Sequence, residues 1–154
     1  NQKKAESAAA QAAAKASAKE AVDGVGKINA AVSVGVTYQN YMTLLAQSAA
    51  AAEAYQPSDT VGIGIKGNLQ KAVNFYSTAG TVWNDDIQGA YDGSSYIADS
   101  EMNPYISDSS YISADDARQA AWMVASDYFD KAKTALDTFN VKSSPSTASD
   151  KAAK

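Results

Sequence analysis

Acidic side chains between residues 85 and 108 supply the hard oxygen ligands that a calcium ion prefers. Their order does not match the calcium-binding loop D-x-[DN]-x-[DN]-G-x5-E. A pair of carboxylates could also act in glycoside hydrolysis, but nothing in the sequence fixes their separation. Acids that keep a surface loop hydrated explain the same composition, so we predict no metal site, no cofactor and no catalytic residue. These acids are Asp85, Asp86, Asp92, Asp99, Glu101 and Asp108.

A glycine-rich segment, GIGIKG at residues 62–67, matches the dinucleotide fingerprint G-x-G-x-x-G letter for letter. That fingerprint binds a pyrophosphate only between a strand and a helix of a βαβ unit. Here it follows a helical segment and Pro57, so we interpret it as a flexible loop between helices. A weaker alternative is an anion held by Lys66 and by the free N–H groups of Gly67 and Asn68 at a helix start.

The composition argues against several classes of function. Histidine and cysteine are absent, which removes the usual general base, the commonest transition-metal ligand and all disulfides. The net charge is −4 and Arg118 is the only arginine, so the basic patch of a nucleic-acid-binding protein is missing. No apolar run approaches the roughly 18 residues of a membrane span. The chain begins at Asn1 without methionine, and we expect a processed or trimmed product.

Helix-forming residues dominate residues 1–55. Residues 1–22 are mostly alanine among lysine, glutamate and glutamine, and Ser17 with Glu20 matches a capping box. Apolar residues then recur every three or four positions from residue 25 to residue 55, until Pro57 ends the pattern. Gly24 and Gly26 weaken the helix or mark a joint, so this region forms either one helix or two. The Ala-rich helix of residues 1–22 could then project from the remainder.

Two further helices are expected downstream. After a connection at residues 58–68, apolar residues from Leu69 to Ile87 alternate steps of four and three, as in a bundle helix. Residues 88–112 have no helical period, and Ser113 can cap a last helix. Residues 141–154 are of low complexity and are predicted to be disordered. The sequence therefore predicts an all-α, up-down bundle of three to four helices in one domain, residues 1–140, with a long Tyr-rich loop before the last helix.

Aromatic residues on the predicted helices permit two interpretations. At helical spacing, aromatic side chains usually belong to the core. They could instead line a pocket for a small ligand inside the bundle. The residues of this possible pocket are Tyr38, Tyr41, Tyr76, Trp83, Trp122 and Tyr128.

The loop before the last helix repeats the dipeptide Tyr-Ile three times among acids, serines and one proline. Long loops inside a folded domain are usually functional or disordered, and disordered segments are poor in aromatics. Tyrosine suits binding surfaces because it combines apolar area with a polar tip. The loop is therefore either a lid over the bundle or a docking face. Its candidate interaction residues are Tyr91, Tyr96, Ile97, Tyr105, Ile106, Tyr111 and Ile112.

Two motifs carry a resemblance to a known group of proteins. VGVTYQNYMTLL at residues 34–45 fits V-G-V-x-Y-x-x-Y-x-x-L-L on one helix, and AGTVW at residues 79–83 fits A-G-x-x-W on the next. Over residues 25–88 the chain resembles bacterial secreted or lipid-anchored helical proteins of uncharacterised function. The resemblance implies a secreted, periplasmic or cell-surface location, with any lipid anchor removed or outside this sequence. Its motif residues are mostly core residues, and no catalytic residues come with it.

These observations favour a protein that works by association. We expect a non-enzymatic, extracytoplasmic structural or interaction protein that associates with copies of itself or docks to another protein. The Tyr-Ile loop and the Ala-rich first helix would be its contact elements. The alternative is a small-ligand-binding or sensor bundle that uses the inner Tyr/Trp residues.

Overall fold

A computed structural model describes residues 1–107 and 110–142 of the chain. Four long helices account for most of it, and no strand occurs in this part of the protein. They are α1 (Gln2–Val34), α2 (Tyr38–Ala54), α3 (Thr60–Gln88) and α5 (Ala114–Lys142). A short helix, α4 (Ser94–Ile97), and a 3₁₀ turn, η1 (Asn103–Tyr105), lie between α3 and α5. The predicted all-α class is confirmed.

The first helix passes through Gly24 and Gly26 without a break, so the expected joint at these glycines is wrong. Both glycines serve packing instead. A Cβ atom at Gly24 would lie 2.6 Å from Cβ of Ala51, and one at Gly26 would lie 3.1 Å from the Phe129 ring. Glycine therefore allows α1 to approach α2 and α5 closely. Ser17 lies inside the same helix, so the capping box predicted there is also wrong.

The break in residues 1–55 falls at residues 35–37, inside the motif on which the resemblance rests. Gly35 adopts a φ of 100°, a conformation that favours glycine, and it ends α1. Thr37 then caps α2, because its hydroxyl oxygen accepts a hydrogen bond from the Asn40 N–H at 3.3 Å. Residues 1–55 therefore form two helices.

The glycine-rich segment is helical and not the expected loop. Asp59 caps α3 by accepting a hydrogen bond from the Gly62 N–H at 2.9 Å, so residues 62–67 lie in the first turns of this helix. The N–H groups of Gly67 and Asn68 are consequently in helical hydrogen bonds, and the suggested anion site is wrong. Lys66 Nζ donates instead to the carbonyl oxygens of Tyr55 and Glu53 at the end of α2.

The end of α3 and the start of α5 follow the capping rules. Gly89 ends α3 in the left-handed conformation at φ 71°, as a C-terminal glycine commonly does. The predicted cap of α5 is confirmed, because Ser113 Oγ accepts a hydrogen bond from the Asp116 N–H at 3.1 Å. The predicted tail begins at residue 141, but α5 continues to Lys142, and residues 143–154 lie outside the described residues.

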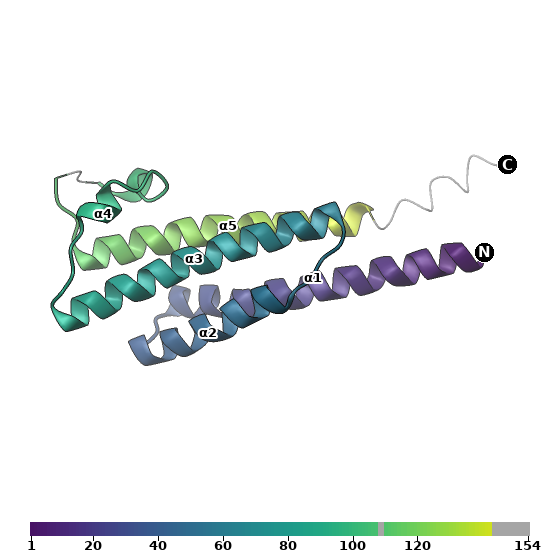
Figure 1. Ribbon diagram of the computed structural model, residues 1–154, viewed down its shortest axis with the longest axis horizontal. Helices are drawn as coiled ribbons and strands as arrows, with labels where there is room; N and C mark the ends of the chain where they lie inside the picture. Colours follow the sequence, from purple (N-terminus) through teal and green to yellow (C-terminus); the bar gives the residue numbers. More distant parts are fainter. Residues whose placement is uncertain (108–109, 143–154) are drawn as a thin grey trace.

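The long helices pack along one another. Figure 1 shows α3 and α5 side by side over most of their length, while α2 contacts both α1 and α3, and α1 also contacts α5. Alanine makes up much of the core, together with fully buried Ile28, Ile65 and Leu69. The small alanine side chains allow the helix axes to lie close together. Among the described residues, no helix is long and apolar enough to cross a membrane.

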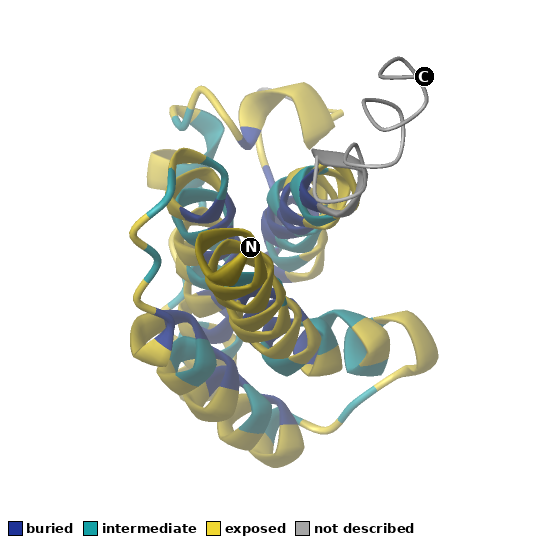
Figure 2. Ribbon diagram, turned by 90° about the vertical axis from the view of Figure 1, so that its right-hand side faces the viewer, coloured by how far each residue is buried: buried dark blue, intermediate teal, exposed yellow. Residues whose placement is uncertain are grey.

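The first half of α1 takes no part in the core. Residues 1–13 are exposed on every side, and the first buried position of the helix is Ala18. Figure 2 shows this as uninterrupted exposed ribbon in the turns nearest the N mark. In Figure 1 the same turns lie at the end of the molecule opposite to α4.

Candidate association surface

The loop between α3 and α5 is folded, with its own capping bonds. The carboxylate of Asp92 accepts a hydrogen bond from the Ser94 N–H at 3.0 Å, which lowers the pKa of Asp92. Asp99 likewise accepts from the N–H groups of Glu101 and Met102, at 2.9 and 3.0 Å. Met102 is fully buried and joins the main core. The described part of the loop is thus anchored to the bundle by an apolar side chain.

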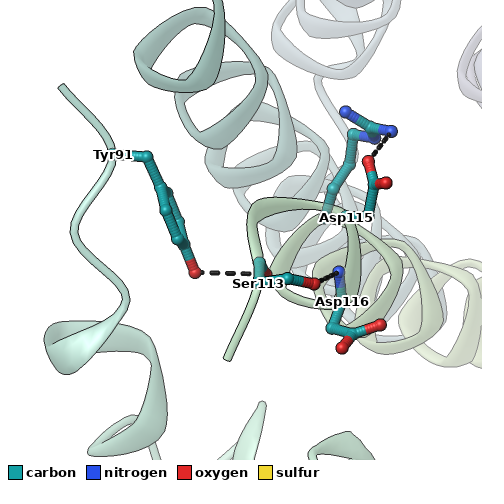
Figure 3. Close-up of polar contacts among 5 residues, drawn as sticks. Tyr91, Ser113, Asp115 and Asp116 are labelled. Carbon is teal, nitrogen blue, oxygen red and sulfur yellow. Dashed lines mark hydrogen bonds and ion pairs between the residues drawn. The ribbon is translucent and has the colours of Figure 1, made fainter. Parts of the chain in front are cut away.

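Tyr91 ties the start of the loop to its end. Its hydroxyl donates to the carbonyl oxygen of Ile112 at 2.8 Å, immediately before α5. It also donates to the carbonyl oxygen of Ser113 at 3.2 Å (Figure 3). Its ring stacks on Tyr96 with the centroids 6.2 Å apart and the planes within 4°. Burial, followed by the nearby Tyr96, raises the pKa of Tyr91 to about 12. Gly93 leaves no room for a side chain, since a Cβ there would lie 2.7 Å from Cγ2 of Ile112.

Two tyrosine–carboxylate hydrogen bonds hold the middle of the loop against α5. The hydroxyl of Tyr105 in η1 donates to Asp127 in α5, and the hydroxyl of Tyr128 in α5 donates to Glu101 in the loop. Each bond favours the protonated phenol beside a carboxylate, and each raises the pKa of its tyrosine. The donors come from opposite sides, so the two bonds form a crossed pair between loop and helix.

The structure separates the predicted interaction residues into two groups. Ile112 is buried, and Tyr91, Tyr96, Ile97 and Ile106 are half-buried in clusters that join the loop to the helices. Tyr105 is 37% exposed and Tyr111 is 70% exposed. The Tyr-Ile pairs therefore share no single outer face. Most of the loop covers the helices, and two of its tyrosines remain at the surface.

A small hollow of about 100 Å³ lies between the end of the loop and the first turns of α5. Met123, which the sequence analysis did not select, is 50% exposed and forms part of its wall. Met123 directly follows Trp122, so it cannot lie on the same face of α5 as the predicted core residues. This position in the sequence already indicated an exposed side chain. We call this feature the Tyr111 hollow. It is lined by Tyr105, Ile106, Ser107, Tyr111, Ile112, Asp116, Gln119, Ala120 and Met123.

The inner aromatic residues meet at the α2–α3–α5 contact. Tyr41 is fully buried, and its hydroxyl donates to the Tyr76 carbonyl oxygen at 2.6 Å and accepts from Trp122 Nε1 at 3.0 Å. The Trp83 ring lies 5.7 Å from Tyr41 and 6.1 Å from Trp122, measured between centroids. The Tyr38 ring meets Trp83 edge-on at 5.6 Å. Five of the six predicted pocket residues are therefore brought together.

The sixth residue, Tyr128, lies elsewhere, stacked on Phe75 and paired with Glu101. In the cluster itself, burial raises the pKa of both Tyr41 and Tyr76. Five hollows in the described part of the chain lie away from all six residues. The side chains fill this contact with their own rings.

Arg118 closes the cluster from the α5 side, although sequence analysis gave it no site role. Its guanidinium lies 4.4 Å from the Trp83 centroid and 5.4 Å from that of Trp122, and it pairs with Asp115 at 2.7 Å. Its Nε is buried and has no partner among the described residues. The single arginine thus covers two tryptophans while its charge is balanced by a neighbouring acid.

The acids of the loop do not gather around a common point. In the part of the chain that the structure describes, no three acidic residues lie close enough together to hold a metal ion. The carboxylates of Asp92 and Asp99 accept hydrogen bonds from backbone N–H groups of the loop, and that of Glu101 accepts one from the Tyr128 hydroxyl. Asp108 lies outside the described residues.

Comparisons with protein-family models, with curated proteins and with solved structures find no match to this chain.

Proposed function

We propose that this chain is a non-enzymatic structural or interaction protein that acts by association, with copies of itself or with another protein. The four long helices would form an up-down bundle as its scaffold. The resemblance over residues 25–88 supports an extracytoplasmic, bacterial setting for that role.

The observation that carries the proposal is the gathering of exposed apolar side chains at the Tyr111 hollow. Tyr105, Tyr111 and Met123 are large, at least a third exposed, and line the same depression. Exposed apolar patches on a water-facing protein usually mark contact sites. Asp116, Ser107 and Gln119 line the same hollow, and such polar groups commonly form the rim of an interface.

The aromatic cluster supports a structural role more than a ligand site. Pockets for small molecules are concave and leave room for the ligand. Here the rings of Tyr41, Trp83 and Trp122 pack against one another, with centroids 5.7–6.1 Å apart. A ligand site in this cluster would therefore require the rings to move apart.

A matched pair of variants tests the association surface. Tyr111→Ser with Met123→Gln removes the two most exposed apolar side chains of the hollow. The control, Ile63→Gln with Ile87→Gln, removes two side chains that are each 57% exposed and lie outside it. Sedimentation would be measured from about 1 μM to about 1 mM, where contacts worth roughly 8 to 4 kcal/mol dissociate.

The expected result is lost association for the hollow variant and unchanged association for the control, with similar melting temperatures for all three proteins. Substitutions at exposed positions typically change stability by no more than about 0.5 kcal/mol. Equal association of the two variants would reject the hollow as the contact site. A wild-type protein that stays monomeric over the whole range would reject self-association.

A further inference from the structure

Charge is distributed unevenly along this molecule. Residues 1–17 contain three lysines, Lys3, Lys4 and Lys15, and one glutamate, which gives this segment a net charge of +2. Residues 72–117 contain eight acidic residues and neither lysine nor arginine. The first segment is the exposed start of α1, and the second includes the loop and the start of α5, at the opposite end in Figure 1. One end of the bundle is therefore basic and the other is acidic.

Most of these charges are not neutralised within the molecule. The two ion pairs among the described residues are Lys19–Asp23 and Arg118–Asp115, so one acid of the acidic end is paired and none of the three lysines of residues 1–17 is. At the acidic end, Asp116 lines the Tyr111 hollow and is exposed. Because the two ends lie far apart in one molecule, they can meet only between molecules.

We propose that the Tyr111 hollow receives residues 1–17 of a second copy of this chain, which we call the N-terminal arm. This inference rests on the proposed function and names the partner of that same surface. Like charges disfavour the pairing of two arms, and they equally disfavour the pairing of two acidic loop ends. Contact between an arm and a loop end is the combination in which the charges attract.

Shape supports the same pairing. The arm presents mainly alanine, so its helix is narrow and a partner surface can approach its backbone closely. The hollow, at about 100 Å³, has room for a side chain and not for a helix. The arm therefore lies across its mouth. A lysine of the arm matches the hollow, because its apolar stem fits beside Tyr111 and Met123 while its ammonium group meets Asp116.

An arm-to-hollow contact is heterologous, since each copy uses two different surfaces. Such a contact leaves one free arm and one free hollow in every assembly, so it builds open chains unless the rotation closes a ring. With the two surfaces at opposite ends of the molecule, addition of copies extends the assembly along its long axis. Average size should consequently rise with concentration without stopping at a dimer.

Complementation between two variants tests this arrangement. The arm variant carries Lys3→Glu, Lys4→Glu and Lys15→Glu, which reverses its charge while keeping residues of similar helix propensity. The hollow variant carries Tyr111→Ser and Met123→Gln. Each alone should weaken association by at least about tenfold, as expected for lost charge complementarity and lost apolar anchors. An equimolar mixture should form a 1:1 complex that grows no further, because one intact arm and one intact hollow remain.

The controls separate this inference from the proposed function. Lys27→Glu reverses an exposed charge on α1 beyond the arm and should leave association unchanged. Circular dichroism and melting temperature of both variants check that they fold, and Tyr111→Ser alone replaces the hollow variant if it does not.

The remaining outcomes are decided by sedimentation. If the hollow variant is monomeric while the arm variant assembles like the wild type, this inference is overturned and the proposed function stands. If both variants assemble like the wild type, this inference is overturned and the hollow is rejected as the contact site, while association through another surface stands. A monomeric wild type, or a mixture without a 1:1 complex, also overturns the inference.

Discussion

The hydroxyl of Tyr41 provides a direct test of whether the aromatic cluster is structural. Tyr41→Phe keeps the ring and removes one oxygen that makes two hydrogen bonds, to the Tyr76 carbonyl and from Trp122 Nε1. Tyr76 lies within α3, where its carbonyl also accepts the regular helical bond. The indole N–H of Trp122 loses the one partner it has in the structure. The loss of stability in Tyr41→Phe should therefore come mainly from the Trp122 N–H that is left without a hydrogen-bond acceptor.

The bond is part-buried, since Trp122 is half-buried while Tyr41 is fully buried. A fully buried donor that loses its partner costs about 1–3 kcal/mol, so we expect Tyr41→Phe to lower the free energy of unfolding by about 1–2 kcal/mol. For a chain of this size the melting temperature should fall by about 2–8 °C. Two related variants calibrate the value. Tyr76→Phe removes a hydroxyl bonded to Asn29 at 2.7 Å and should cost about 1 kcal/mol. Tyr38→Phe removes an exposed bond of 3.3 Å to Asn84 and should cost no more than about 0.5 kcal/mol.

Urea unfolding followed by tryptophan fluorescence suits this series, because Trp83 and Trp122 are the two tryptophans of the chain and both lie in the cluster. The reasoning is refuted if Tyr41→Phe is as stable as the wild type, or more stable. Such a result would show that the Tyr41 hydroxyl does not stabilise the folded protein. Residues of this kind occur where a function is maintained at the expense of stability. The cluster would then have to be reconsidered as a ligand site.

Three further predictions concern the loop. Gly93→Ala should destabilise the protein by about 1–3 kcal/mol, because the new Cβ would lie 2.7 Å from both the Tyr91 hydroxyl and Ile112 Cγ2. Gly64→Ala, in open space on α3, should instead stabilise it by about 0.5–1 kcal/mol, and thermal melts that fail to separate the two would contradict the packing of the loop. A chelator should leave the melting temperature unchanged, and a drop that Ca²⁺ restores would reveal a metal site. Folding raises the pKa of Tyr91 from 10.0 to about 12, so the stability that its protonated hydroxyl contributes is complete below pH 10 and is lost as the pH rises to 12. In a plot of the free energy of unfolding against pH, Tyr91→Phe should flatten the decline between pH 10 and pH 12. An unchanged decline in the variant would argue against the buried hydroxyl.

The all-α class and the cap at Ser113 could be predicted because they depend on local patterns. Helix boundaries near glycine could not. Gly24, Gly26 and residues 62–67 look like breaks from propensity alone, yet close contacts with Ala51 and Phe129, and the Asp59 cap, keep these segments helical. Gly35 breaks a helix where the apolar period continues, because its φ is positive. Tertiary contact and backbone conformation decided these cases, and neither can be read from the sequence pattern.

Sequence analysis selected the loop that forms one side of the Tyr111 hollow but could not divide its residues into buried and exposed ones. Tyr96 and Tyr111 have the same neighbour, isoleucine, and similar polar surroundings in the chain. Tyr96 nevertheless stacks on Tyr91 and joins the core clusters, while Tyr111 remains 70% exposed. The difference arises from the turns at Asp92 and Asp99, which decide which side chains face the helices. The exposure of Met123 could be inferred from its position on α5, but its place beside Tyr111 depends on these turns.

The hydrogen bonds that hold the loop also bear on how well its surface can bind. A contact made by a mobile loop must supply the conformational entropy of ordering it, which weakens binding. Here Tyr91 joins the two ends of the loop, and the crossed bonds Tyr105–Asp127 and Tyr128–Glu101 attach its middle to α5. Tyr105 is itself part of the wall of the Tyr111 hollow. The same bonds that make most of the loop a cover for the helices therefore fix one wall of the hollow in advance, so a partner would meet a surface that is already formed.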